Sequence, residues 1–175
     1  MKPYSDRIIW IVATLVFLHT PRLCAAGNEL RSLFGRWQVT AVRLDGTLMR
    51  TPTYNINDPE LMGRWILIAG DRITTNMPEE TTCQIPHVKV ETSTVIELVN
   101  RTMGKSVLTS HEINKFKLPV SLHQKSRIFW ITCREGDIGP DIPFGPVGAN
   151  WIAELSPQLL AMRWYDNTIL LLKRR

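Results

Sequence analysis

Residues 150–173, NWIAELSPQLLAMRWYDNTILLLK, form the clearest structural pattern in the chain. Three strand-like runs, 150–155, 159–165 and 168–173, are joined by two short segments, Ser156-Pro157-Gln158 and Asp166-Asn167. Short turns rich in Asp and Asn are typical of antiparallel hairpins. Side chains alternate between two faces, with Trp151, Ala153 and Leu155 opposite Ile152 and Glu154, and Leu160, Met162 and Trp164 opposite Ala161, Arg163 and Tyr165. The segment therefore predicts three consecutive antiparallel strands.

Most of the remaining chain also has the composition of short strands. Runs rich in apolar and β-branched residues occur at 37–41, 65–69, 72–75, 84–90, 93–99, 115–122 and 127–133. Asp45-Gly46, which follows the first run, is a strong tight-turn signal. After residue 26 we expect no strong amphipathic helix, apart from a turn or two within 28–33. About eight to ten short strands separated by turn signals predict an all-β meander, as a barrel or a sandwich.

The first 26 residues have the three parts of a secretory signal. Lys2 and Arg7 precede an apolar run at 8–18, and small residues follow in Cys24-Ala25-Ala26. The run is about half as long as a membrane-spanning helix requires. Lipidation of Cys24 is disfavoured because Leu23 stands where a small residue is needed. We expect cleavage after Ala26, a mature domain at 27–175, a periplasmic or secreted location, and no stable membrane span after cleavage.

Removal of the signal leaves a nearly balanced chain. Lys2, Arg7, Arg22 and Asp6 leave with it, so that 21 basic and 16 acidic residues become 18 and 15. The basic residues are dispersed, except for a short run at the end of the sequence. Nucleic-acid binding usually requires a dense basic stripe or a known module. We therefore expect no nucleic-acid partner.

Two cysteines, Cys83 and Cys133, remain after the predicted cleavage. An even number in an oxidising compartment predicts one disulfide, which closes a loop of about 50 residues and contributes about 4 kcal/mol in the chain-entropy model. No metal is expected, because the cysteines and the scattered His87, His111 and His123 lack the spacing of a four-ligand site.

Catalytic motifs are also missing from the sequence. It contains no Gly-x-Ser-x-Gly elbow, no His-Glu-x-x-His pair and no phosphate-binding glycine loop. The sequence leaves catalysis open, because scattered residues can assemble an active site. It favours a protein that is not an enzyme, and we name no catalytic residue and no cofactor.

Two polar segments are predicted to be loops. Residues 50–61 contain Pro52 and Pro59, and residues 134–150 contain four glycines and three prolines. A long loop in a compact domain is often functional, although a plain solvated connection is equally compatible with this composition. In the functional interpretation, Phe144 is a plug flanked by Asp137 and Asp141, and these three residues bind a partner.

The opening of the first predicted strand resembles a known family. Gly35-Arg36-Trp37 follows a short possible helical turn and is similar to the Gly-x-Trp motif of lipocalins and their calycin relatives. Gly63-Arg64-Trp65 repeats the motif. The resemblance implies a single antiparallel meander barrel, in which Trp37 seals one end and Lys173 or Arg174 packs over its ring.

The tryptophans provide candidate ligand contacts in such a barrel. We expect Trp130, Trp151 and Trp164, which lie on neighbouring runs, to line the interior. The resulting hypothesis is an exported, non-enzymatic protein that binds a small apolar ligand inside the barrel. The alternative is a periplasmic inhibitor or immunity protein that binds an exported hydrolase or toxin through its loops. Asn100-Arg101-Thr102 is a glycosylation acceptor only in a eukaryotic source, which the sequence leaves open.

Overall fold

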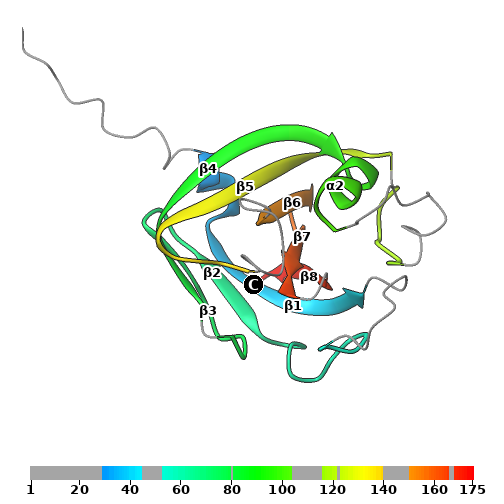
Figure 1. Cartoon of the computed structure of the whole chain (residues 1–175), viewed down its shortest axis with the longest axis horizontal. Helices are drawn as coiled ribbons and strands as arrows, with labels where there is room; N and C mark the ends of the chain where they lie inside the picture. The colour runs from blue at the N-terminus through cyan, green and yellow to red at the C-terminus, as the bar shows by residue number, and fades with distance from the viewer. Residues whose placement is uncertain are drawn as a thin grey trace, which may run out of the picture.

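Eight antiparallel strands form a closed barrel in which neighbouring strands follow the order of the chain (Figure 1). The computed structural model describes residues 29–44, 53–79, 81–103, 116–121, 123–139, 150–165 and 168–175. The predicted signal at 1–26 lies outside these ranges. Among the described residues, no helix is long and apolar enough to cross a membrane.

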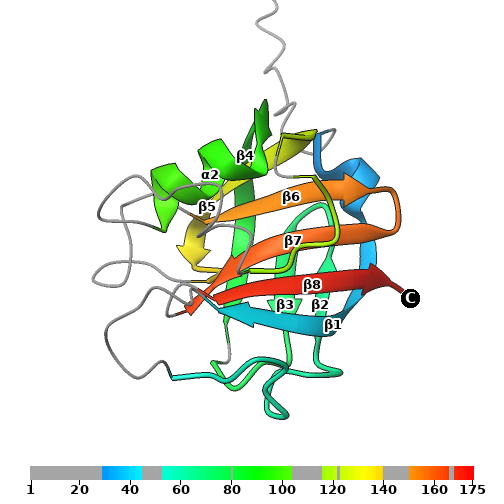
Figure 2. The ribbon, with the colours of Figure 1, turned by 90° about the vertical axis from the view of Figure 1, so that its right-hand side faces the viewer.

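The barrel closes because its first strand pairs with both its second and its last. The strands are β1 (Gly35–Leu44), β2 (Trp65–Ile68), β3 (Arg72–Thr75), β4 (Thr82–Thr94), β5 (Lys125–Gly136), β6 (Trp151–Ser156), β7 (Leu159–Trp164) and β8 (Thr168–Arg174). Trp37 lies opposite Ile66 of β2 on one side and opposite Arg174 of β8 on the other. Figure 2 shows β6, β7, β8 and β1 side by side. The predicted all-β antiparallel meander barrel is therefore confirmed.

Alternation along the strands produces two apolar clusters. One fills the inside of the barrel and includes Trp37, Phe129, Ile152 and Trp164. The other contains the opposite faces of β5 to β8 together with one side of the helix α2 (Val95–Thr102). Because both faces of these strands are buried, β8 is a nearly continuous apolar run rather than an alternating one.

The helix α2 corrects the sequence analysis, which predicted a strand at 93–99. The strand β4 ends at Thr94, whose side chain accepts a hydrogen bond from the backbone N–H of Glu97, while the Glu97 carboxylate accepts one from Thr94 N–H. This reciprocal capping box can start a helix even in a β-branched sequence. The described part of the predicted 115–122 run, 116–121 without its ends, is likewise not a strand.

A disulfide joins β4 to β5, as predicted. Cys83 and Cys133 are bonded, with their Cα atoms 5.2 Å apart. The adjacent Gly136 has a φ of 71°, and a Cβ atom placed there would lie 2.0 Å from the backbone oxygen of Thr82. Only glycine permits this backbone approach, so the disulfide and Gly136 together fix the point at which the chain leaves β5. The predicted loop at 134–150 was wrong for residues 134–136, which belong to β5 because this strand continues its pairing with β4 as far as Cys83.

Candidate functional site

One end of the barrel is sealed by the indole of Trp37. The short helix η1 (Leu30–Leu33) buries Leu30 and Leu33 beside it, and Trp37 Nε1 donates a hydrogen bond of 2.7 Å to the Leu33 carbonyl oxygen. The Arg174 guanidinium carbon lies 4.4 Å from the Trp37 ring centroid. Its nitrogens also donate to the carbonyl oxygens of Phe34, at 2.8 Å, and Ser32, at 2.6 Å.

These contacts join the first strand, β1, and the last strand, β8, to the segment that precedes β1. Of the two cations that the lipocalin resemblance offered, the structure places Arg174 over Trp37, whereas Lys173 is exposed on the outer surface. A guanidinium suits the position, because it stacks on the indole face while its edge donates to carbonyl oxygens. A ligand would therefore have to enter the barrel elsewhere.

The opposite end of the barrel carries a hydrogen-bonded carboxylate. The strand register places Leu44, Trp164 and Thr168 together at the end away from Trp37. There Trp164 Nε1 donates to Glu79 Oε2 at 3.1 Å, and the Tyr54 hydroxyl donates to Glu79 Oε1. Three separate segments thus meet at the Glu79 carboxylate, which is half-buried, whereas both of its aromatic donors are buried.

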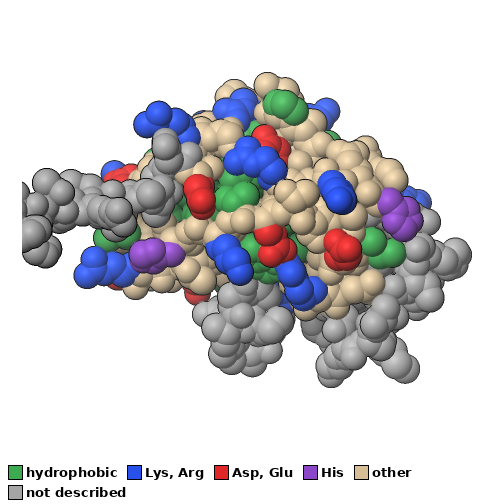
Figure 3. Space-filling model, turned by 90° about the horizontal axis from the view of Figure 1, so that it is seen from above, with side chains coloured by type: hydrophobic (Ala, Val, Ile, Leu, Met, Phe, Trp, Pro, Cys, Tyr) green, Lys and Arg blue, Asp and Glu red, His purple; other side chains and the backbone are tan. Residues whose placement is uncertain are grey.

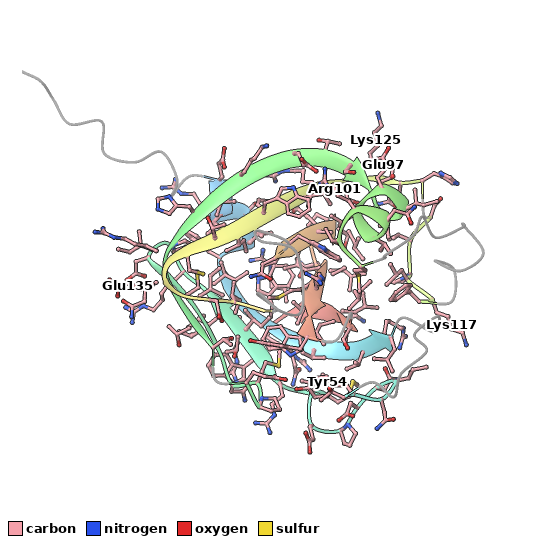
Figure 4. All side chains as sticks on the ribbon, in the orientation of Figure 1. Tyr54, Glu97, Arg101, Lys117, Lys125 and Glu135 are labelled. Carbon is pink, nitrogen blue, oxygen red and sulfur yellow. A yellow bond between two sulfur atoms is a disulfide. The ribbon has the colours of Figure 1, made fainter. Side chains whose placement is uncertain are left out.

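Figure 4 shows Tyr54 on the side of the barrel away from α2. It lies in the 53–64 segment, which runs along β1 and hydrogen-bonds to it through Asn57 and Gly63. Asp58 fixes the turn before β2 by accepting from the backbone N–H groups of Asn55, at 2.8 Å, and Glu60, at 2.9 Å. These hydrogen bonds hold the pKa of the Asp58 carboxyl below its usual range.

Thr168 has a buried hydroxyl that makes no hydrogen bond to the residues that the structure describes. Thr168 as a whole is fully buried, and its Cα lies opposite those of Trp164 and Leu44. It shares the strand face of Leu170 and Leu172, which belong to the interior cluster. Within the described ranges, Thr168 Oγ1 makes no hydrogen bond. A buried hydroxyl that is left unsatisfied costs about 1–3 kcal/mol.

The interior behind Thr168 and Glu79 is apolar. The interior side chains behind this end, on β1, β5, β6, β7 and β8, include Val42, Phe129, Ile131, Ile152, Met162 and Leu170. An apolar wall with a carboxylate and a hydroxyl at its rim suits a molecule with an apolar body and one hydrogen-bonding head.

Of the three tryptophans that the sequence predicts to line the interior, one lies inside the barrel and two lie outside it. Trp164 belongs to the interior cluster, as expected. Trp151 belongs to the outer cluster, where its Nε1 donates to Thr102 Oγ1 of α2 at 3.0 Å. Trp130 lies opposite Trp151 in the sheet and faces outward with it. The expectation was wrong for Trp130 and Trp151, because α2 gives them an apolar place outside the barrel.

Trp130 is covered by an arginine of the same helix. The Arg101 guanidinium carbon lies 4.4 Å from the Trp130 ring centroid, and Arg101 also pairs with Glu91 of β4. Figure 4 shows Arg101, a residue of α2, near Glu97 and Lys125. Both outward tryptophans thus hold α2 against the barrel, which is a structural role.

The predicted partner-binding residues are only partly described. Asp137 is half-buried and directly follows β5. Asp141 and Phe144 lie outside the described residues, as does His111. Among the described residues, no group of His, Cys, Asp and Glu could hold a metal ion.

Sequence reasoning missed Tyr54, Glu79 and Thr168. These residues are separated by long stretches of chain, and none belongs to a recognisable motif. Only closure of the barrel brings them to one end, so no local signal could have identified them. The capping box at Thr94 to Glu97 was the missed signal that could have been found.

The sequence matches no known family model, and no curated protein or solved structure matches it at a significant level.

Proposed function

We propose that the protein is an exported, lipocalin-like binding barrel that takes up a small amphipathic molecule at the Thr168 end. The Cys83–Cys133 disulfide supports action in an oxidising compartment. The closed meander barrel with Trp37 and Arg174 across one end supports the lipocalin-like class. The observation that carries the proposed activity is the buried hydroxyl of Thr168, which makes no hydrogen bond to the described residues and belongs to the strand partner of Trp164, the donor to Glu79.

The rim favours a ligand whose head donates hydrogen bonds. A carboxylate accepts hydrogen bonds and does not donate when ionised, whereas a threonine hydroxyl does both. An alcohol or ammonium head therefore finds an acceptor at Glu79 and a partner at Thr168. A carboxylate head would meet the negative charge of Glu79. The apolar body of the ligand would contact Trp164 and Met162.

The head-group preference can be tested with three ligands of equal chain length. We expect decylamine and decanol to quench tryptophan fluorescence with higher affinity than decanoate. A difference on the order of tenfold corresponds to one charged or well-formed hydrogen bond. If none of the three binds, a carrier of such ligands is rejected. If decanoate binds most tightly, the role of Glu79 is wrong.

Replacement of Thr168 by Val separates binding from stability. The two side chains have nearly the same shape, so the folded protein should be as stable as the wild type or more stable, because an unsatisfied hydroxyl is removed. Decanol affinity should fall about fivefold to tenfold if Thr168 bonds to the head group. Thr132→Val is the matched control, since Thr132 is an exposed residue on β5. Equal decanol affinity in Thr168→Val and the wild type would contradict the proposed site.

A further inference from the structure

The outer surface of β1 and β2 carries cations around the half-buried indole of Trp65, and among the described residues these cations form no ion pair with a carboxylate side chain. We name it the Arg36 surface, and it contains Arg36, Gln38, Trp65, Leu67, Lys173 and Arg175. The strand register places Arg36 opposite Leu67, and Gln38 opposite both Trp65 and Lys173, so these side chains share one face. Figures 1 and 2 show β1 next to β2, on the side of the barrel away from α2.

Arg36 is oriented by an aromatic ring rather than by an acid. Its guanidinium carbon lies 4.8 Å from the ring centroid of Trp65. Its side chain makes no hydrogen bond or ion pair with any residue that the structure describes. Stacking uses the face of a guanidinium and leaves the N–H groups at its edge available for a carboxylate. Trp65 therefore holds Arg36 in place without satisfying its charge.

The neighbouring side chains add positive charge and no negative charge. Arg175 donates through Nε to Gln38 Oε1, and Lys173 is exposed. In the described ranges, neither Arg175 nor Lys173 takes part in an ion pair with a carboxylate side chain. Arg36, Gln38, Trp65 and Arg175 surround a surface hollow of about 350 Å³. By contrast, basic and acidic side chains are interspersed on the face seen in Figure 3.

Leu67 gives the surface an apolar part. It is 38% exposed, which makes it one of the few large hydrophobic side chains on the outside of the described structure. Interfaces typically combine an aromatic or aliphatic anchor with arginine, and lysine is more common at the rim. The Arg36 surface has this composition, with Trp65 and Leu67 at the centre and cations around them.

We propose that the Arg36 surface docks an acidic segment of another protein, with one carboxylate held between Arg36 and Arg175 in the hollow. Because the barrel is closed, β1 and β2 have their two neighbours already and offer no free edge for an added strand. The partner must be recognised through side chains, for which stacked arginine is well suited. A nucleic acid is less compatible, because its regularly spaced phosphates require a longer basic stripe than three residues.

The docking proposal can be tested with fluorescein-labelled octaglutamate in an anisotropy assay at low salt. We expect saturable binding that Arg36→Glu weakens on the order of tenfold, as for one partner of an interfacial charge pair. Arg72→Glu is the control, because it makes the same charge change on β3, where Arg72 is already paired with Asp71 at 3.3 Å. It should change affinity by about twofold or less.

Three results would overturn the docking proposal. The first is the absence of saturable octaglutamate binding to the wild type. The second is equal weakening by Arg36→Glu and Arg72→Glu, which would indicate attraction by net charge alone. The third is tighter, Arg36-dependent binding of inorganic phosphate or duplex DNA, which would identify a phosphate site. Decanol binding should be unchanged in Arg36→Glu, so the two proposed sites succeed or fail independently.

Discussion

Arg174 should be among the most important polar side chains for the stability of the barrel. Its guanidinium stacks on Trp37 at 4.4 Å and donates to two backbone carbonyl oxygens, those of Phe34 and Ser32. A cation–π contact at a partly buried site contributes about 1 kcal/mol. Each hydrogen bond from a charged donor contributes about as much after solvation is considered. We therefore expect Arg174→Ala to lower the free energy of unfolding by about 3 kcal/mol, a large part of the stability of a small domain.

The measurement is urea unfolding followed by far-UV circular dichroism, with the disulfide kept oxidised. Arg174→Lys should lower the free energy of unfolding by about half as much as Arg174→Ala. Lysine keeps the positive charge, but it lacks the planar, forked guanidinium group. Arg31→Ala is the matched control: Arg31 lies in η1 near the same end, is exposed, and makes no side-chain hydrogen bond or ion pair in the described part of the chain. It should change stability by less than about 0.5 kcal/mol.

A loss of less than about 1 kcal/mol in Arg174→Ala would refute this reasoning. It would mean that Trp37 packs as well without its cation, and that solvent satisfies the two carbonyl oxygens. A loss in Arg31→Ala equal to that in Arg174→Ala would also contradict it, because the effect would then follow from net charge.

Two further predictions concern the disulfide and the 53–64 turn. Replacing both Cys83 and Cys133 with Ser should lower the free energy of unfolding by about 4 kcal/mol, the chain-entropy value for a 50-residue separation. Urea unfolding of the wild type with and without reductant should give the same difference. An unchanged urea midpoint would exclude a stabilising role for the disulfide. Asp58→Asn should destabilise the protein at neutral pH by about 1–2 kcal/mol. Because the folded state lowers the pKa of Asp58, its contribution is present above the usual value of 3.8 and is lost as pH falls through the lower folded-state pKa. The stability difference between wild type and Asp58→Asn should therefore narrow in acid, and a difference that is constant from neutral pH to pH 3 would contradict this role.

The strands were largely predictable, and the helix was not. Alternation in 150–173 indicated three antiparallel strands whose ends agree with β6, β7 and β8 to within about a residue. The β-branched run that precedes Glu97 has the composition of a strand, yet the capping box and burial against the barrel make it α2. Here tertiary packing outweighed local propensity.

The candidate sites show the same division. Trp37 and a cation near the end of the sequence could be proposed from a short motif, because the sealing contact joins residues of the first and last strands. The inward or outward orientation of Trp130 and Trp151 could not be predicted, because it depends on the helix that covers the outside of β5 and β6. The sequence could not predict that Glu79 and Thr168 lie at the same end of the barrel, since they are far apart in the chain.

The sequence by itself determined that this protein is an antiparallel meander with one disulfide, because alternation, turn residues and cysteine pairing are local or countable properties. Only the tertiary structure decided which face of each strand is the interior, and which residues meet at the two ends. The physical reason is that closing β1 against β8 sets the register of the whole barrel. That register places Arg174 on Trp37 at one end and buries the Thr168 hydroxyl at the other, where it makes no hydrogen bond to the described residues.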